Sequence, residues 1–401
     1  MTTIKLLTIS TNFILLISAA GVVQAIILAA LLFFHPKSDR TASSFLSLHI
    51  LTISLFMLMP VVEYFFSWRS LAALISFQYL IGPFLYLYIR SFKGSITWRI
   101  AWPHFLLFAI VSGIMIFYYY PWISKFPDSD KAPLEILLAP ITYALVFARN
   151  AQMLAYYFLC RRILGRYQRS IQHLFSETSK VNLDWIKWLL NGFLLLIIIV
   201  FAIIYFIVTY PENFSLFILI STAVITPYIY VVAIKGMGQP TLWQIEAGKN
   251  KEKIEEEITV VEKIQTSTKR SEPPLSQPLV DEKTNEIIGG IILLMEKDKL
   301  YQEPELTLQL LSDKLRVPAY QVSQAINDGL KKNFYDVVNG YRVEEAKRLL
   351  IDSKNKNYTI LSVGFEAGFN SKTTFNTVFK KFTGLTPTEF RDKFKLALQE
   401  I

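Results

Sequence analysis

The sequence has little of the chemistry that most enzymes use. It contains one cysteine, Cys160, so no disulfide can form within the chain, and its four histidines are far apart: His35, His49, His104 and His173. This spacing is not typical of a metal site. The sequence also has no glycine-rich phosphate loop and no nucleophile elbow. We therefore expect neither an enzyme nor a bound metal or cofactor.

Charged residues are also scarce, at 18% of the 401 residues, whereas hydrophobic residues make up 52%. The apolar residues form blocks of about 20, the length that a helix needs to cross a bilayer. The first block has no small-residue cleavage site, so we interpret it as a retained helix. So many consecutive blocks argue against buried helices of a soluble domain. The predicted spans are Asn12–Phe34, Phe45–Phe66, Leu71–Ile89, Trp102–Tyr120, Leu134–Leu159, Trp188–Tyr210 and Phe214–Ile234.

Lysine and arginine residues predict how these spans are oriented. They are most frequent in the loops after the first, third and fifth spans, and loops with this bias stay in the cytoplasm. We therefore expect residues 1–235 to form a domain of about seven transmembrane helices in the inner (cytoplasmic) membrane, with the N-terminus outside and the C-terminal region in the cytoplasm. The basic residues of the fifth loop are Arg161, Arg162, Arg166, Arg169 and Lys180.

One polar group interrupts the fifth predicted span: Arg149, Asn150 and Gln152. A charge inside a bilayer is costly and usually faces the interior of the helix bundle. This group is therefore a candidate site for an unknown signal ligand or membrane partner, with Glu63 or Gln78 beside it. The alternative is a structural role, in which Arg149 reaches the cytoplasmic side or ties helices together.

Residues 236–285 are polar and charged, and they separate the hydrophobic half from the C-terminal region. Ile254, Ile258 and Val261 form a short apolar stripe. This stripe would allow a homodimer through residues 245–264; a solvated helix against lipid headgroups explains it equally well. The Pro- and Ser-rich residues 266–278 are typical of a flexible linker.

The segment from Thr359 to Phe382 has the pattern of a helix-turn-helix unit. A short apolar-periodic helix is followed by Gly368, which can adopt the positive φ that a tight turn needs. Ser371 then begins a second helix as its N-cap. We expect Phe375, Val378, Phe379 and Phe382 to pack inward on this helix, because they recur at helical spacing.

These residues resemble the C-terminal signature of the bacterial AraC family of transcription regulators. The shared features are the Gly368-Phe369 turn, the phenylalanine-rich helix, and a closing Gly384-Leu385-Thr386-Pro387-Thr388-Glu389-Phe390-Arg391. The commoner residue at position 390 is Tyr. The resemblance covers about Glu303 to Arg391 and does not extend to the hydrophobic half. It implies that residues 286–401 form a DNA-binding domain with two helix-turn-helix units joined by a long helix.

A first unit can be recognised upstream. Leu306, Leu308, Leu311 and Leu315 mark its supporting helix, and Pro318 to Leu330 its recognition helix, with Val322, Ala325 and Ile326 inward. Residues 334–350 are the predicted connecting helix. Arg316 stands where the family usually has Gly, and Ser312 where it usually has Ala. We therefore expect strain of about 1 kcal/mol in this turn.

Each recognition helix is expected to lie in the major groove of promoter DNA, since two units about 34 Å apart can reach successive grooves. The outward polar residues have the donors and acceptors that phosphates and base edges need. The predicted DNA-binding residues are Tyr320, Gln321, Ser323, Gln324, Asn327, Ser371, Lys372, Thr373, Asn376, Thr377, Lys380 and Lys381.

The sequence thus predicts an all-α protein: a polytopic transmembrane helical bundle followed by a cytoplasmic AraC-type double helix-turn-helix domain. The predicted function is that of a membrane-anchored one-component transcription regulator, in which the membrane domain senses a signal or a partner and the tail binds promoter DNA. The alternative is a transporter-like or scaffold membrane protein whose helical tail serves protein interaction.

Overall fold

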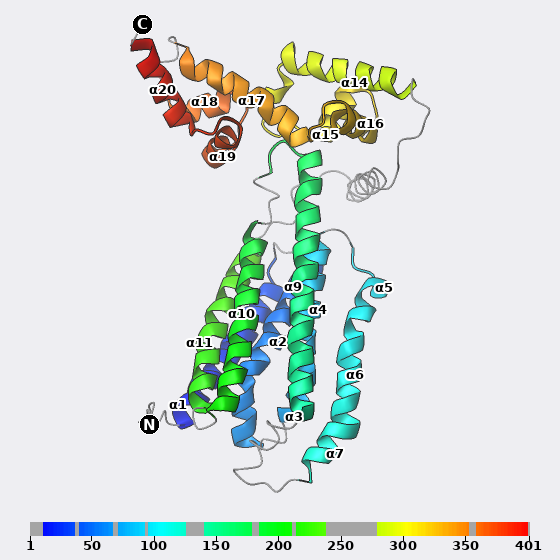
Figure 1. Ribbon diagram of the computed structural model, residues 1–401, viewed down its shortest axis with the longest axis vertical. Helices are drawn as coiled ribbons and strands as arrows, with labels where there is room; N and C mark the ends of the chain where they lie inside the picture. Colours follow the sequence, from blue (N-terminus) through cyan, green and yellow to red (C-terminus); the bar gives the residue numbers. More distant parts are fainter. Residues whose placement is uncertain are drawn as a thin grey trace. The chain divides into compact units, whose positions relative to one another are not determined.

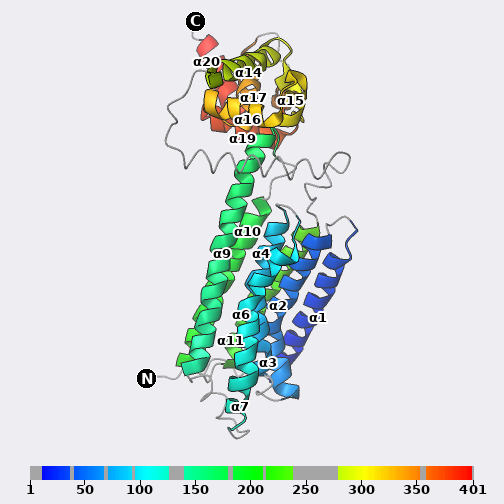
Figure 2. The same ribbon diagram turned by 90° about the vertical axis from the view of Figure 1, so that its right-hand side faces the viewer.

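A computed structural model describes residues 11–36, 40–66, 71–92, 95–125, 140–178, 184–210, 214–237, 279–352 and 358–399 (Figures 1 and 2). These residues are helical apart from turns, loops and one isolated antiparallel bridge, between Phe175 and Thr307. The predicted all-α fold is therefore confirmed. The chain divides into two compact units, of which the first is Met1–Gly165 with Leu183–Ile245 and the second is Arg166–Asn182 with Glu246–Ile401.

The first unit is a bundle of mostly apolar helices, in which α1 and α2 lie side by side and α11 packs against α1, α2 and α10 (Figure 2). Its elements are α1 (Thr11–Phe33), α2 (Arg40–Phe65), α3 (Leu71–Phe77), η2 (Gln78–Leu80), α4 (Ile81–Ser91), α5 (Trp98–Ala101), η3 (Trp102–Phe105), α6 (Leu106–Ile114), η4 (Met115–Tyr119), α7 (Tyr120–Ile123), most of α9 (Pro140–Leu174), α10 (Asp184–Thr209) and α11 (Phe214–Met237).

Among the described residues, five helical stretches of this bundle are long and apolar enough to cross a membrane. They are Asn12–Phe33, Arg40–Val62, Trp98–Trp122, Asp184–Ile203 and Leu219–Met237. The other two predicted spans correspond to the interrupted helix α3–η2–α4 and to α9. Large apolar side chains also point outward from the bundle: Phe117 is 84% exposed and Phe147 68%. Such exposure is unfavourable in water and suits contact with lipid, which supports the predicted membrane location.

The second unit contains two small helical cores that share the long helix α17. Val337 and Val338 of α17 contribute to the first core, and Val343 and Ala346 contribute to the second. The elements are α14 (Leu279–Glu296), η6 (Leu300–Gln302), α15 (Leu308–Leu315), α16 (Ala319–Gln324), η7 (Ala325–Gly329), α17 (Phe334–Ile351), α18 (Ile360–Glu366), α19 (Lys372–Thr383) and α20 (Pro387–Gln399) (Figure 1).

Helix α14 begins at Leu279, inside the segment predicted as a linker, and it packs on the first core through Ile287, Ile291 and Met295. The apolar stripe expected to support a homodimer, residues 245–264, lies outside the described residues.

Candidate nucleic-acid interface and intramembrane polar group

The second helix-turn-helix unit consists of α18, a tight turn and α19. Gly368 in the turn has φ +92°, and a Cβ there would lie 2.5 Å from the carbonyl oxygen of Tyr301. Only glycine fits, because both the backbone angle and the close approach exclude a side chain. Ser371 caps α19, since its Oγ accepts a hydrogen bond from the Thr374 backbone N–H at 3.1 Å. The predicted turn and the predicted cap are both confirmed.

Helix α19 has one buried apolar face. Phe375, Val378 and Phe379 are buried as predicted, and the rings of Phe375 and Phe379 meet edge to face at 5.6 Å. Phe382 is 37% exposed, so the prediction that it packs inward is wrong. Its ring lies beside Gly340 of α17, and a glycine has no side chain that could cover it.

The other face of α19 carries most of the residues predicted to contact DNA. Lys372, Thr373, Thr377, Lys380 and Lys381 are exposed, whereas Ser371 and Asn376 are partly buried. Lys381 has an intramolecular charged partner, because its Nζ lies 2.7 Å from Asp336 Oδ1 of α17. Lysine and amide side chains on one exposed helix face are suited to phosphates and base edges.

The first helix-turn-helix unit follows the same plan with a less favourable turn. Thr307 caps α15 by accepting a hydrogen bond from the Leu310 N–H at 3.1 Å. Helix α15 ends at Arg316, whose φ of +55° confirms that a non-glycine residue occupies the left-handed position. Ser312 is buried and donates to the Val317 carbonyl oxygen at 2.5 Å, so its hydroxyl ties the helix to the turn.

The first recognition helix consists of α16 and a π-helical turn, η7. Val322, Ala325 and Ile326 are buried, as predicted. Tyr320 and Gln324 are exposed, and Gln321 is partly buried and donates to the Tyr320 hydroxyl at 2.8 Å. These three residues lie where a recognition surface would be expected.

Two other residues of this helix were predicted to lie on that surface but do not. Ser323 is only 4% exposed, so the prediction that it points outward is wrong. Asn327 is partly buried and contacts both Ser323 and His173. Residues from distant parts of the chain pack near this side of the helix: His173 of α9 lies near Asn327, and Leu174 belongs to the same core as Val322. A sequence pattern within the recognition helix cannot show such distant neighbours.

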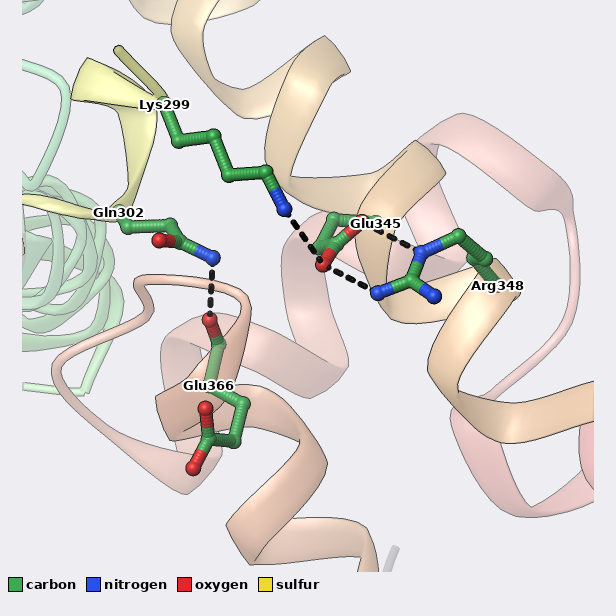
Figure 3. Close-up of polar contacts among 5 residues, drawn as sticks. All are labelled: Lys299, Gln302, Glu345, Arg348 and Glu366. Carbon is green, nitrogen blue, oxygen red and sulfur yellow. Dashed lines mark hydrogen bonds and ion pairs between the residues drawn. The ribbon is translucent and has the colours of Figure 1, made fainter. Parts of the chain in front are cut away.

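Polar contacts also link the residues around η6 to α17 and to the end of α18 (Figure 3). Glu345 of α17 accepts two hydrogen bonds from Arg348, at 2.8 and 2.9 Å, and lies 4.0 Å from Lys299 Nζ. The hydrogen bonds from Arg348 lower the pKa of the Glu345 carboxyl. Gln302 Nε2 donates to the carbonyl oxygen of Glu366, at the end of α18, at 3.3 Å. The segment before the first helix-turn-helix unit therefore contacts the second helix-turn-helix unit directly.

A buried arginine of α17, Arg342, was not recognised in the sequence. Its side chain is fully buried and donates to the carbonyl oxygens of Tyr301 and Glu303, both at 2.7 Å. The helical period offered a signal, because position 342 lies four residues from both Val338 and Ala346, which face the cores.

In the bundle of apolar helices, the polar group of α9 points inward. Arg149 is 5% exposed; it donates to Gln78 Oε1 and lies over the ring of Phe56 at 5.1 Å. Gln152 Nε2 donates to the Tyr79 carbonyl oxygen at 3.1 Å. Gln78 is thus confirmed as the neighbour of Arg149, and the side chain of Glu63 lies outside the described residues. Both contacts join α9 to η2.

Asn150 does not join that contact. Its Nδ2 donates to the Val146 carbonyl oxygen of its own helix at 2.9 Å. The structure therefore brings together Arg149 and Gln152 with η2, whereas Asn150 satisfies its own backbone. In the described part of the chain, no three His, Cys, Asp or Glu side chains are arranged as metal ligands.

Comparisons with known proteins agree with this geometry in the part of the chain that contains both helix-turn-helix units. Residues 311–393 match the family described as Helix-turn-helix domain. A protein of Staphylococcus aureus (strain COL), named as an uncharacterized HTH-type transcriptional regulator, is 29% identical over 113 residues, which are 28% of this chain and 14% of that protein. The match therefore covers a small part of the relative's length. No solved structure matches the chain significantly. Residues 311–393 form a helix-turn-helix domain of a DNA-binding, regulatory type.

Proposed function

We propose that the protein is a membrane-anchored one-component transcription regulator that binds double-stranded promoter DNA through α16 and α19. The observation that carries the proposal is the pair of helix-turn-helix units joined by α17 within residues that match a helix-turn-helix family. The Staphylococcus relative, by its name a transcriptional regulator, supports the same function.

The chemistry of α19 fits a DNA-reading helix. Its exposed side carries Lys372 and Lys380, which suit phosphates, and Asn376, whose amide can pair with two atoms of adenine. Its N-terminus supplies backbone N–H groups and the positive end of the helix dipole, which favour a phosphate. Tyr320, Gln321 and Gln324 supply the corresponding face of the first unit.

The bundle of apolar helices is the proposed sensor. It would receive a signal or bind a membrane partner, and the tail would remain in the cytoplasm, where the DNA is. The buried contact between Arg149 and Gln78 is the candidate polar site of the sensor, because a charged side chain inside a bilayer is retained mainly for function or for helix association. A signal would then act by shifting the equilibrium between two arrangements of the tail.

Crosslinking the intact protein to genomic DNA in cells, followed by sequencing of the bound fragments, tests this function. We expect enrichment at a small number of promoters, and binding of the purified full-length chain to those fragments that weakens steeply as salt rises. Uniform recovery of the genome, with no salt-dependent binding to any recovered fragment, would favour a tail that serves protein interaction instead.

A further inference from the structure

Residues 173–177 lie at the end of α9, the helix that contains most of the fifth predicted span, yet they belong to the compact unit that contains the helix-turn-helix domain. We call them the connector segment. They comprise the last two residues of α9, His173 and Leu174, and the non-helical residues Phe175, Ser176 and Glu177. Every one of these residues contacts the helix-turn-helix domain.

The first contacts are with the first helix-turn-helix unit. Leu174 is buried in its core, and Phe175 forms the antiparallel bridge with Thr307, the N-cap of α15. Ser176 donates twice to the Leu306 carbonyl oxygen, from its backbone N at 3.2 Å and from its Oγ at 2.6 Å. The His173 ring lies near Asn327 in the recognition helix.

The second set of contacts is with the connecting helix α17. Asn339 Nδ2 donates to the Ser176 carbonyl oxygen at 2.9 Å, and Arg342 Nη2 donates to Ser176 Oγ at 3.3 Å. Burial lowers the pKa of Arg342 to about 10, and the Glu177 carboxylate acts in the opposite direction by favouring the charged guanidinium. The connector segment therefore supplies both a hydrogen-bond partner and a compensating charge to a buried arginine of the domain.

The third contact is with the second recognition helix. Thr374 Oγ1, in the first turn of α19, donates to Glu177 Oε1 at 3.2 Å, and the two residues are only 9% and 7% exposed. Thr374 lies on the buried side of α19, away from Lys372 and Asn376. The connector segment thus contacts the second unit without covering its exposed polar face.

These contacts involve both recognition helices and the helix between them. We propose that the connector segment fixes the position of the two helix-turn-helix units relative to each other, and that a signal in the membrane domain regulates DNA binding by tightening or releasing it. The inference rests on the proposed function and adds the route of its regulation. Helix α9 is continuous from Pro140 to Leu174, so it runs without a break from the buried Arg149 to the connector segment. A shift or rotation of a rigid helix reaches its end, whereas a flexible linker would absorb it.

The relative position of the two units determines which spacing of half-sites the protein can bind. Preferred duplexes should therefore be selected from a random library with the full-length chain in lipid nanodiscs, and binding should be compared on variants in which the two half-sites are moved apart by two base pairs. The variants are Glu177→Gln, Thr374→Val and the double substitution. The matched control is Glu344→Gln, which removes an exposed carboxylate from α17.

We expect the wild type and Glu344→Gln to bind the shifted duplex at least about tenfold more weakly than the selected one. Glu177→Gln and Thr374→Val should each reduce this ratio of affinities about fivefold. The double variant should add little to either single variant, because both substitutions act on the same contact: Glu177→Gln removes the charge of the acceptor, and Thr374→Val removes the donor. If the wild type selects no duplex, the proposed function and the inference fail together. If the wild type shows the spacing preference and Glu177→Gln retains it, the inference alone is overturned.

A crosslink tests the contact independently. Residues paired across an antiparallel bridge are close enough for a disulfide, and Cys160, the one native cysteine, is buried. Phe175→Cys with Thr307→Cys should form a disulfide in the full-length chain under mild oxidation. The oxidised protein should discriminate between the two spacings at least as strongly as the same protein after reduction. Failure to form the disulfide, or a looser preference in the oxidised form, contradicts the inference.

Discussion

At the scale of single residues, Asn376 offers the sharpest test of base recognition. It lies on the same side of α19 as the exposed Lys372 and Lys380. An amide that pairs with adenine contributes about 1–3 kcal/mol of discrimination. We expect Asn376→Ala to relax the preference at one or two base pairs, measured by binding to a panel of single-base variants of the selected duplex. An equal loss of affinity for every sequence would show that Asn376 does not read a base.

Lys380 tests the contribution of phosphate contacts. Its side chain is exposed, whereas its neighbour Lys381 is engaged with Asp336 and is the less direct choice. Lys380→Ala should weaken binding to all sequences alike and reduce the salt dependence by about one phosphate contact. The measurement is affinity for one duplex over a series of salt concentrations. Lys314→Ala, an exposed lysine on the supporting helix α15, is the control and should leave the slope unchanged.

The positions that sequence predicted well at this scale are those whose environment is set by their own helix. Val322, Ala325 and Phe379 are buried because the helical period alone places them inward. The prediction for Ser323 was wrong because this part of the helix is buried at a core to which residues far away in sequence, such as Leu174, contribute. The prediction that Phe382 packs inward was wrong because the residue opposite it is a glycine. Both errors arise from tertiary neighbours that a periodic pattern cannot reveal.

At the scale of elements, the fit of α19 against its core can be tested with a matched pair. Phe379 is fully buried, in contact with Phe375 and Phe390, whereas Phe382 in the same helix is 37% exposed. Phe379→Ala should lower the free energy of unfolding by about 3–5 kcal/mol, because a cavity remains in a small core. Phe382→Ala should lower the free energy of unfolding by clearly less. Denaturant unfolding followed by circular dichroism measures both, and equal losses would contradict the described packing.

Helix α9 allows a test of the sensor. Arg149 and Gln78 join α9 to η2 inside the bundle. Arg149→Leu should leave insertion intact and change the signal-dependent output, because a charged side chain is lost from a buried polar contact. A reporter driven by a promoter recovered from cells measures this, with protein level as the control. Gln78→Leu should have a similar effect. An unchanged response at normal protein level would reduce Arg149 to a structural residue.

Turns and caps could be predicted because their causes are local. Gly368 adopts the positive φ expected for it, and Ser371 forms the expected cap. The π-helical turn at Ala325–Gly329 and the docking of the connector segment could not be predicted in this way. The sequence around Ser176 contains no recognised motif, and its meaning depends on Arg342 and Thr374, which lie more than 160 residues further along the chain.

At the scale of the whole molecule, the hydrophobic blocks were sufficient to predict a helical bundle but not the form of each span. Helix α3–η2–α4 is interrupted at Gln78–Leu80, next to the buried contact with Arg149, and α9 continues well beyond the predicted end of its span at Leu159. Hydropathy averages over a window, so it cannot locate a 3-10 interruption or the point at which an apolar helix continues as an amphipathic one.

The orientation of the chain remains a prediction, and two exposed positions test it. Positive-inside bias places Lys125 outside the cell and Arg166 in the cytoplasm. Lys125→Cys and Arg166→Cys, each made in a Cys160→Ala background, should differ in their reaction with a membrane-impermeant maleimide added to intact cells. We expect labelling at position 125 and labelling at position 166 only after the cells are permeabilised. The fifth loop retains four basic residues after Arg166 is replaced, so the substitution itself should not invert the protein. Labelling of position 166 in intact cells would place the helix-turn-helix domain outside, away from DNA, and would contradict both the topology and the proposed function.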